Sequence, residues 1–301
     1  MKRAYAVLDV FTDKALTGNP LAIVFDGEGL ETNEMQAIAG EFNLSETVFV
    51  QPAAQPHHSA AVRIFTPGVE LPFAGHPTVG AAIALAKRQL GEGGTGDVII
   101  VLEEKIGIVR CGVKVSEGGA FAEFDLPQLP SAIEAPPESA AIAAALSLSP
   151  KDIGFENHVP TAWSAGVPFI MVPVHDLNAA GRAQVNSAEW SNVFADHPAS
   201  GVFVYCRECV RHEAQFHARM FAPEKGIIED PATGSAIAAF SGAVVDFDEP
   251  LDGLHTILVE QGVEMGRPSL VTLEVELSGQ ELIRARIGGN AVELMRGELD
   301  I

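Results

Sequence analysis

The stretch EDPATGSA, Glu229–Ala236, has an echo far upstream in AGHPTVGAA, Ala74–Ala82. In both, a polar residue is followed by proline, two residues and a glycine, ahead of a run of small apolar residues. Proline is favoured at the first helical position, so the polar residues before it, His76 and Asp230, are predicted to be the N-caps of two helices. The free N–H groups and partial positive charge of a helix N-terminus suit an anion. Two such helix starts facing each other would form an anion site.

Further segments repeat in the same order along the chain, at offsets that differ by only a few residues. They are GNPLAIV from Gly18 and GVPFIMV from Gly166 (166 − 18 = 148), Val48–Val50 and Val202–Val204, RIFTP from Arg63 and RMFAP from Arg219, and Pro77 and Pro231. This order predicts a duplicated unit, and hence two topologically equivalent domains. Four prolines between residues 127 and 137 mark the boundary, which gives domains of 1–127 and 128–285.

Each half is expected to contain more strands than helices. Alternating apolar, β-branched and aromatic residues predict strands in the first half at 4–11, 21–25, 47–50, 60–66, 98–102, 107–115 and 120–126. The main helices, Pro77–Leu90 and Pro231 to about Val245, are alanine-rich and apolar on nearly every side, as a helix enclosed by a sheet would be. We therefore predict an α+β fold of two pseudo-symmetric domains, each a curved, mostly antiparallel, barrel-like sheet around a central α-helix. The two helix starts are then expected to meet at a cleft between the domains, where ligands commonly bind.

Composition limits the possible function classes. Forty acidic and 19 basic residues give a formal charge of −21, which repels nucleic acid and anionic membranes. No apolar run approaches the roughly 18 residues of a membrane helix, and the N-terminal residues do not resemble a signal peptide. We expect a cytoplasmic protein without a nucleic-acid or membrane partner. Three cysteines, Cys111, Cys206 and Cys209, are too few for a disulfide framework, and the spacing of cysteines and histidines predicts no metal site.

Several motifs resemble one known family along the whole chain. They are GNPLAIVF (18–25), NLSETVFV (43–50), RIFTPGVELPFAGHPTVGAA (63–82), SAGVPFIMVPV (164–174), EDPATGSA (229–236) and GGNAVELMRGEL (288–299). They are similar to the PhzF-like proteins of phenazine biosynthesis, which share a fold with diaminopimelate epimerase. The resemblance implies two similar barrel-like domains, isomerase chemistry without a cofactor, and a homodimer. It also implies that the last strand, about 286–301, completes the first domain.

The resemblance further implies roles for particular residues. The glutamate of the N-L-S-E segment transfers a proton in this family, and it corresponds to Glu46. The histidine of G-H-P-T and the aspartate and serine of D-P-A-T-G-S assist it, and they correspond to His76, Asp230 and Ser235. The residues expected to contact the substrate are Asn19, Gly75, Thr233 and Gly234.

Glu46 breaks the symmetry of the repeat. At the offset of 154 its counterpart is Ser200 (46 + 154 = 200), so the second half has no acid there. Duplication produces the scaffold twice, whereas chemistry can require a single base. The apolar neighbours Leu44, Val48 and Phe49 are expected to raise the pKa of the Glu46 carboxyl toward a range where it can both take and return a proton.

Most of these residues also have a structural interpretation. Capping alone would explain the positions of His76 and Asp230, although capping favours Asp, Asn, Ser or Thr over His. Gly75 and Gly234 can serve turn geometry, Ser235 tight packing, and Asn19 a turn. The matched arginines Arg63 and Arg219 are expected to form structural ion pairs, with a carboxylate-binding role as the alternative.

Two other functions compete with the isomerase. Epimerases of the same fold use a cysteine at the head of each central helix, but here we expect those places to hold Gly75-His76 and Glu229-Asp230. A non-catalytic protein that binds a small anion on the same scaffold is the second alternative. The combined set of motifs favours an isomerase that moves a proton between carbons of a small, carboxylate-bearing metabolite, with Glu46 as general acid and base.

Overall fold

The computed structural model describes residues 2–194, 196–199 and 201–301, and the chain forms two compact units. Unit 1 combines the chain up to Asp125 with Gly288–Ile301, and unit 2 is the continuous stretch Leu126–Ile287. These bounds lie close to the predicted ones, after residues 127 and 285. Both units are mixed α+β with barrel-like sheets, which confirms the predicted fold class. Among the described residues, no helix is long and apolar enough to cross a membrane.

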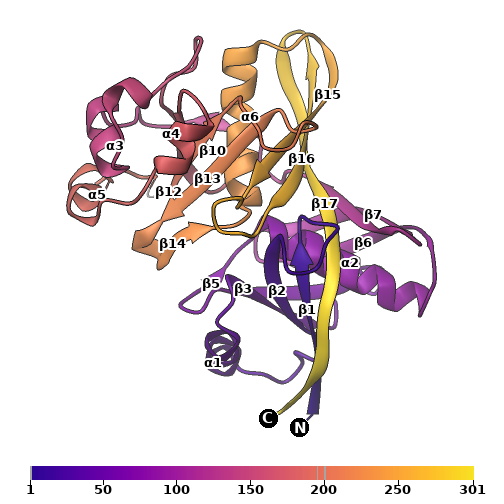
Figure 1. Ribbon diagram of the computed structural model, residues 1–301. Coiled ribbons are helices and arrows are strands. Elements are labelled where there is room, and N and C mark those ends of the chain that lie inside the picture. The colour runs from indigo at the N-terminus through magenta and orange to yellow at the C-terminus, as the bar shows by residue number, and fades with distance from the viewer. Residues whose placement is uncertain (1, 195, 200) are drawn as a thin grey trace. The chain divides into compact units, whose positions relative to one another are not determined.

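Unit 1 is a strand-rich shell around one long helix (Figure 1). Its elements are β1 (Lys2–Val10), β2 (Asn19–Val24), α1 (Thr32–Phe42), β3 (Glu46–Gln51), β4 (Ala60–Phe65), β5 (Glu70–Leu71), α2 (Gly75–Leu90), β6 (Gly96–Glu104), β7 (Gly107–Ser116) and β8 (Gly119–Asp125). The yellow strand β17 (Glu281–Asp300) runs beside β1 in Figure 1, with Lys2 opposite Asp300 and Val10 opposite Ala291. Unit 1 is therefore closed by a strand nearly 300 residues away in sequence from its first one.

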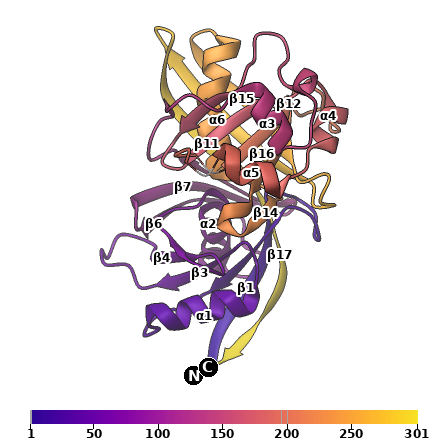
Figure 2. The same ribbon diagram turned by 90° about the vertical axis from the view of Figure 1, so that its left-hand side faces the viewer.

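Helix α2 forms the centre of unit 1. It packs against β1, β2, β3, β6, β7 and β8, and 11 of its 16 residues are buried. Its small side chains allow strands to pack closely on all sides. Because strands surround the helix, its sequence is apolar on nearly every face. Helix α1 lies on another face of the sheet (Figure 2), where Met35 and Ala39 pack against Val24, Phe49 and Phe65.

Gly80 sets the distance between α2 and the sheet. A Cβ atom at this position would lie 2.5 Å from Leu21 Cδ2 and 2.9 Å from Val10 Cγ2, and both of these side chains are fully buried. We expect Gly80→Ala to lower the free energy of unfolding by about 1–3 kcal/mol, because overpacking outweighs the better helix propensity of alanine. The matched control is Gly40→Ala in α1, where the nearest atom is 3.9 Å away. That variant should gain about 0.5–1 kcal/mol. Urea unfolding measures both, and equal effects would contradict the packing argument.

Unit 2 repeats this arrangement and adds a helical layer. Its elements are β9 (Ser131–Ala132), α3 (Ser139–Ala145), β10 (Thr161–Ser164), β11 (Pro168–Pro173), α4 (Leu177–Arg182), α5 (Ser187–Phe194), β12 (Gly201–Cys206), β13 (Phe216–Ala222), β14 (Ile227–Asp230), α6 (Gly234–Asp248), β15 (Gly253–Gln261), β16 (Ser269–Ser278) and the start of β17. Helices α3, α4 and α5 bury Ile142, Ala180 and Trp190 in one core with the sheet residues Val172 and Val204. The central helix, α6, contacts β10, β11 and β16.

The sheet registers define which residues of the two units are equivalent. Strands β2 and β3 are parallel with Leu21 opposite Glu46, and β11 and β12 are parallel with Phe169 opposite Gly201. Since Phe169 matches Leu21 at the offset of 148, the counterpart of Glu46 is Gly201 and not Ser200, which lies outside the described residues. A Cβ atom at Gly201 would lie 2.7 Å from the Phe169 ring. The position of the acid in unit 1 is thus filled by a neighbouring ring in unit 2.

The registers also correct the alignment of the motif EDPATGSA (229–236) with its upstream echo AGHPTVGAA (74–82). Ile64 lies opposite Leu71 in the β4–β5 pair, and Met220 lies opposite Asp230 in the β13–β14 pair. Because Met220 and Ile64 are matched positions of RMFAP and RIFTP, Asp230 corresponds to Leu71. The proline that matches Pro231 is accordingly Pro72 and not Pro77.

The predicted N-caps of the two central helices, His76 and Asp230, are wrong. Helix α2 begins at Gly75 with Ala74 as its N-cap, so His76 is the second helical residue. Helix α6 begins at Gly234 with Thr233 as its N-cap, and Asp230 is the last residue of β14. Proline is tolerated as the third residue of α2 because the N–H groups of the first turn have no intrahelical acceptor in any case. The equivalent of His76 is therefore Ser235, one residue after each initial glycine.

Candidate functional site

Three of the predicted site residues meet at the start of α2 in unit 1. Glu46 is the first residue of β3, His76 lies in the first turn of α2, and Asn19 is the first residue of β2. His76 Nε2 lies 3.3 Å from Glu46 Oε2, and Asn19 Nδ2 lies 3.4 Å from His76 Nδ1. The side chains of His76 and Glu46 are 4% and 12% exposed. The imidazole is thus held between an amide and a carboxylate, in a largely buried position.

The contact with Asn19 determines which nitrogen of His76 carries the proton. An amide nitrogen can only donate a hydrogen bond, so Nδ1 of His76 accepts. The proton of the neutral ring is then on Nε2, the atom that faces Glu46. Nε2 makes no hydrogen bond of good geometry within the described part of the chain. The site therefore contains an N–H donor directed toward the region of the carboxylate.

His76 is neutral at physiological pH. Burial lowers its pKa to about 3, because a charged imidazolium loses its hydration in the interior. The Glu46 carboxylate acts in the opposite direction, since a nearby anion favours the imidazolium. Burial prevails over this effect. His76 is suited to donate a hydrogen bond to an oxyanion and not to act as a cation.

The start of α2 adds backbone donors next to this ring. Gly75 and His76 are its first two residues, and their N–H groups have no acceptor within the helix. Thr78 N–H already donates to Ala74 O. The helix N-terminus also carries partial positive charge, which stabilises an anion over about one turn. Gly75 and His76 together can therefore present up to three N–H groups to a negatively charged ligand.

The predicted residues of unit 2 gather at the start of α6. Asp230 is 5% exposed, and its Oδ2 accepts a hydrogen bond from Thr233 Oγ1 at 2.6 Å. Gly234 and Ser235 follow as the first two residues of the helix, and Ser235 is partly exposed. Their N–H groups, like those in α2, have no intrahelical acceptor. The expectation that the starts of α2 and α6 face each other stays a prediction.

Gln261, which no sequence motif indicates, stabilises the turn between β14 and α6. Gln261, at the end of β15, is fully buried and lies beside Asp230 and Thr233. Its Nε2 donates to Asp230 O at 2.7 Å and to Thr233 Oγ1 at 3.1 Å, and its Oε1 accepts from Thr233 N–H at 3.1 Å. Ser269 Oγ donates to Pro231 O at 2.9 Å. The turn between β14 and α6 is therefore fixed by side chains of β15 and β16.

Glu104 occupies the matching place in unit 1. Ala61 lies opposite Glu103 in the parallel β4–β6 pair, and His217 lies opposite Glu260 in the parallel β13–β15 pair. The next residues, Glu104 and Gln261, are thus equivalent. Neither was predicted, although the repeated acid–acid and acid–amide pairs at the ends of two apolar strands are a signal that the internal repeat could have revealed.

The two matched arginines form ion pairs within their own units. Arg63 contacts both carboxylate oxygens of Glu70 at 2.8 Å. Arg219 contacts those of Glu229 at 2.8 and 2.9 Å, and its Nη1 donates to Ala180 O and Ala183 O. Bidentate pairs of this kind use the guanidinium donors that a carboxylate ligand would need. The geometry agrees with the predicted structural role.

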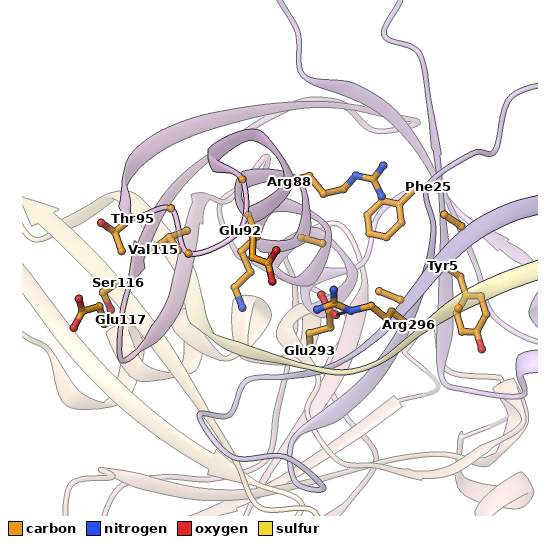
Figure 3. Close-up of a pocket in the computed structure, with 18 of the residues that line it drawn as sticks. Tyr5, Phe25, Arg88, Glu92, Thr95, Val115, Ser116, Glu117, Glu293 and Arg296 are labelled. Carbon is orange, nitrogen blue, oxygen red and sulfur yellow. Dashed lines mark hydrogen bonds and ion pairs between the residues drawn. The ribbon is translucent and has the colours of Figure 1, made fainter.

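A cavity of about 950 Å³ in unit 1 contains none of the predicted site residues. It lies at the other end of α2, where Arg88 stacks over Phe25 at 4.1 Å and Arg296 pairs with Glu293 (Figure 3). A helix of 16 residues is about 24 Å long at 1.5 Å per residue. The chemistry of Glu46 and His76 is therefore separated from this cavity by most of the helix.

The cysteines do not lie at the helix starts. Cys111 is buried in β7, Cys206 ends β12, and Cys209 follows it. The structure corrects the second of the two places considered for the epimerase pair, since the head of α6 is Thr233-Gly234 and not Glu229-Asp230. Neither head carries a thiol, so a two-cysteine mechanism has no support in these residues.

A family model described as phenazine biosynthesis-like protein matches residues 8–297 of the chain. The chain belongs to this family. Over 99% of both chains it is 54% identical to an uncharacterized isomerase, mll1393, from Mesorhizobium japonicum. Over 98% of both chains it is 32% identical to the trans-2,3-dihydro-3-hydroxyanthranilate isomerase of Pseudomonas fluorescens. The chain is an isomerase of the phenazine biosynthesis-like family.

Solved structures agree with this assignment. A PhzF-family phenazine biosynthesis protein of Bacillus anthracis covers 100% of both chains with a TM-score of 0.89 and 28% identity. A hydroxyproline epimerase from Agrobacterium vitis covers 99% of this chain and 92% of its own, with a TM-score of 0.63 and 11% identity. The second likeness shows a shared fold alone.

Proposed function

We propose that this isomerase moves a proton between carbons of a small, carboxylate-bearing metabolite, and that Glu46 takes and returns that proton. The observation that supports the proposal most directly is the contact of 3.3 Å between the Glu46 carboxylate and the N–H of a neutral, buried His76. A carboxylate beside a neutral donor, in surroundings that exclude most water, suits this proton transfer.

The proposed reaction needs no external reactant. The Glu46 carboxylate removes a proton from a carbon next to an electron-withdrawing group, and the electron pair of that C–H bond moves into the adjoining π system. The resulting anion accepts hydrogen bonds from His76 Nε2–H and from the free N–H groups of Gly75 and His76. Glu46 then returns the proton to a different carbon, so that substrate and product have the same composition. Oriented donors of this kind lower such barriers by about 3–4 kcal/mol each.

We propose a separate, ligand-holding role for the residues of unit 2. Asp230 and Thr233 are fixed by Gln261, and the N–H groups of Gly234 and Ser235 are available to an anion. A carboxylate group on the substrate would suit these backbone donors, whereas the acidic Asp230 would suit a hydroxyl or amino group.

Incorporation of solvent deuterium tests the proposal. The first compound to try is trans-2,3-dihydro-3-hydroxyanthranilate, because relatives that are 32% identical are named for its isomerisation. We expect the product formed in deuterated water to carry deuterium at the carbon that gains the proton, observed by proton NMR. Binding without isomerisation or exchange, across this compound and other small cyclic carboxylates, would instead indicate the non-catalytic anion-binding protein.

A further inference from the structure

Thr78 makes two short contacts that a single hydroxyl proton cannot serve if both partners are acceptors. Its Oγ1 lies 2.8 Å from Ala74 O and 2.8 Å from Glu104 Oε1. A hydroxyl donates one hydrogen bond, and the Ala74 carbonyl can only accept. When Thr78 donates to Ala74 O, the bond with Glu104 requires a proton on the carboxyl group.

The second oxygen of Glu104 leads to the same conclusion. Glu104 is 8% exposed, and its Oε2 has no hydrogen-bond partner among residues 2–194, 196–199 and 201–301. An ionised carboxylate with a bare, buried oxygen is costly, whereas the neutral acid is not. Burial raises the pKa of Glu104 to about 8, and a hydrogen bond that Thr78 would donate to the ionised form does not offset this effect.

The repeat shows what the fold requires at this position. The equivalent residue in unit 2 is Gln261, a side chain that is always neutral and that donates to Thr233, the N-cap of α6. In unit 1 the N-cap of α2 is Ala74, and Glu104 reaches it through Thr78. Both side chains therefore hold the N-cap residue of a central helix, one directly and the other through a hydroxyl.

We propose that Glu104 is a positioning residue that works as a neutral, protonated acid: it donates to Thr78, Thr78 donates to Ala74, and the pair fixes the turn that presents Gly75 and His76. Its effect on turnover rests on the function proposed above. Its protonation state does not, and that state is measurable without any substrate.

The groups around Glu104 leave its proton in place. On β7, burial and, to a smaller extent, Glu104 raise the pKa of Cys111, so the thiol is neutral. On α2, His76 is neutral as well. Lys105, the next residue, pairs with Glu70 at 2.8 Å and is itself largely exposed.

The pH dependence of stability tests the protonation state. Between pH 4.5 and about 8 the unfolded chain has released the Glu104 proton while the folded chain keeps it, so the contribution of Glu104 to wild-type stability declines as pH rises through this range and is constant above it. Glu104→Gln removes this decline. We expect the melting temperature of the variant relative to wild type to rise by about 2–4 °C per pH unit from pH 5 to 8 and to stay constant above.

Two control variants make this result specific. Glu92→Gln, an exposed acid on the same unit, should show no such trend. Gln261→Glu, the reverse exchange in unit 2, should be destabilised progressively as pH rises. A difference between Glu104→Gln and wild type that is the same at every pH would overturn the proposal, because it would mean that Glu104 is ionised throughout.

Kinetics with any compound that turns over test the positioning role. Glu104→Gln keeps a donor for Thr78 and should keep kcat within about threefold of wild type. Glu104→Leu and Thr78→Val remove the donor chain and should lower kcat about tenfold or more, with a smaller change in KM. Equal losses in Glu104→Gln and Glu104→Leu would overturn the positioning role. If no compound turns over, the proposed function fails while the melting experiment still decides the state of Glu104.

Discussion

Glu46→Gln is expected to lower kcat by about 10²–10⁴-fold on any true substrate, the range that a positioned general acid or base contributes. The amide has the same shape as the carboxylate and can still lie beside His76, but it cannot accept a proton from carbon. Because binding contacts are preserved, KM should change far less than kcat. Stopped assays by NMR or absorbance measure both constants.

Two further variants show whether the loss is due to the base itself. Glu41→Gln, which removes an exposed carboxylate from α1, should leave both constants unchanged. Glu46→Asp keeps the carboxylate but shortens its reach, so its kcat should lie between those of wild type and Glu46→Gln. A Glu46→Gln enzyme that exchanges solvent deuterium into the substrate as fast as wild type would exclude Glu46 as the base.

Arg219→Met is expected to have the largest effect on stability. Arg219 is 6% exposed, and its guanidinium contacts Glu229 and the two carbonyls of Ala180 and Ala183. The methionine would leave a mostly buried carboxylate and two carbonyls without their donors. Breaking a buried pair in this way costs about 3–5 kcal/mol, which corresponds to a fall in melting temperature of roughly 10 °C.

The equivalent change in unit 1 is the natural control. The Arg63 side chain is 25% exposed, and its partner Glu70 also contacts Lys105 at 2.8 Å. Arg63→Met should therefore cost only about 1 kcal/mol, the usual range for a pair near the surface. Similar losses in the two variants would show that burial does not distinguish the two ion pairs.

The duplicated strand pattern could be predicted because it is a local property. Alternation of apolar residues along segments such as 47–50 and 107–115 depends only on neighbours in sequence, and some of the strand segments, Val48–Val50 among them, recur in order in the second half. The structure places strands there, at Glu46–Gln51 and Gly107–Ser116. The alanine-rich helices were found for the same reason.

The first residues of the two central helices could not be predicted from the sequence motif alone. The pattern proline, two residues, glycine occurs at Pro77 and at Pro231, but the register of β13 with β14 makes Pro72 the true counterpart of Pro231. Whether proline is the first or third helical residue depends on how the preceding strand enters the turn. That is decided by pairings between strands, which a single motif does not contain.

The positioning residues were missed because their partners are distant in sequence. Glu104 acts on Thr78 and Gln261 acts on Thr233, across 26 and 28 positions. The one signal in their own segments is the repeated pair, Glu103-Glu104 and Glu260-Gln261, which becomes visible only when the two halves are aligned strand by strand. The group of Asn19, Glu46 and His76 was accessible only through the resemblance to a family, since three separate elements bring these residues together.

The strand β17 has a consequence for how the protein is made. Unit 2 is one continuous stretch, so every partner it needs has been synthesised by Ile287. Unit 1 is not, because β1 pairs early with β2 on one side but finds its second neighbour only in residues 291–300, after all of unit 2 has left the ribosome. Until then β1 carries an unpaired edge, which is a template for pairing with other chains. The half made first is thus the last to be completed, and its nascent form is where we expect a chaperone to be needed most.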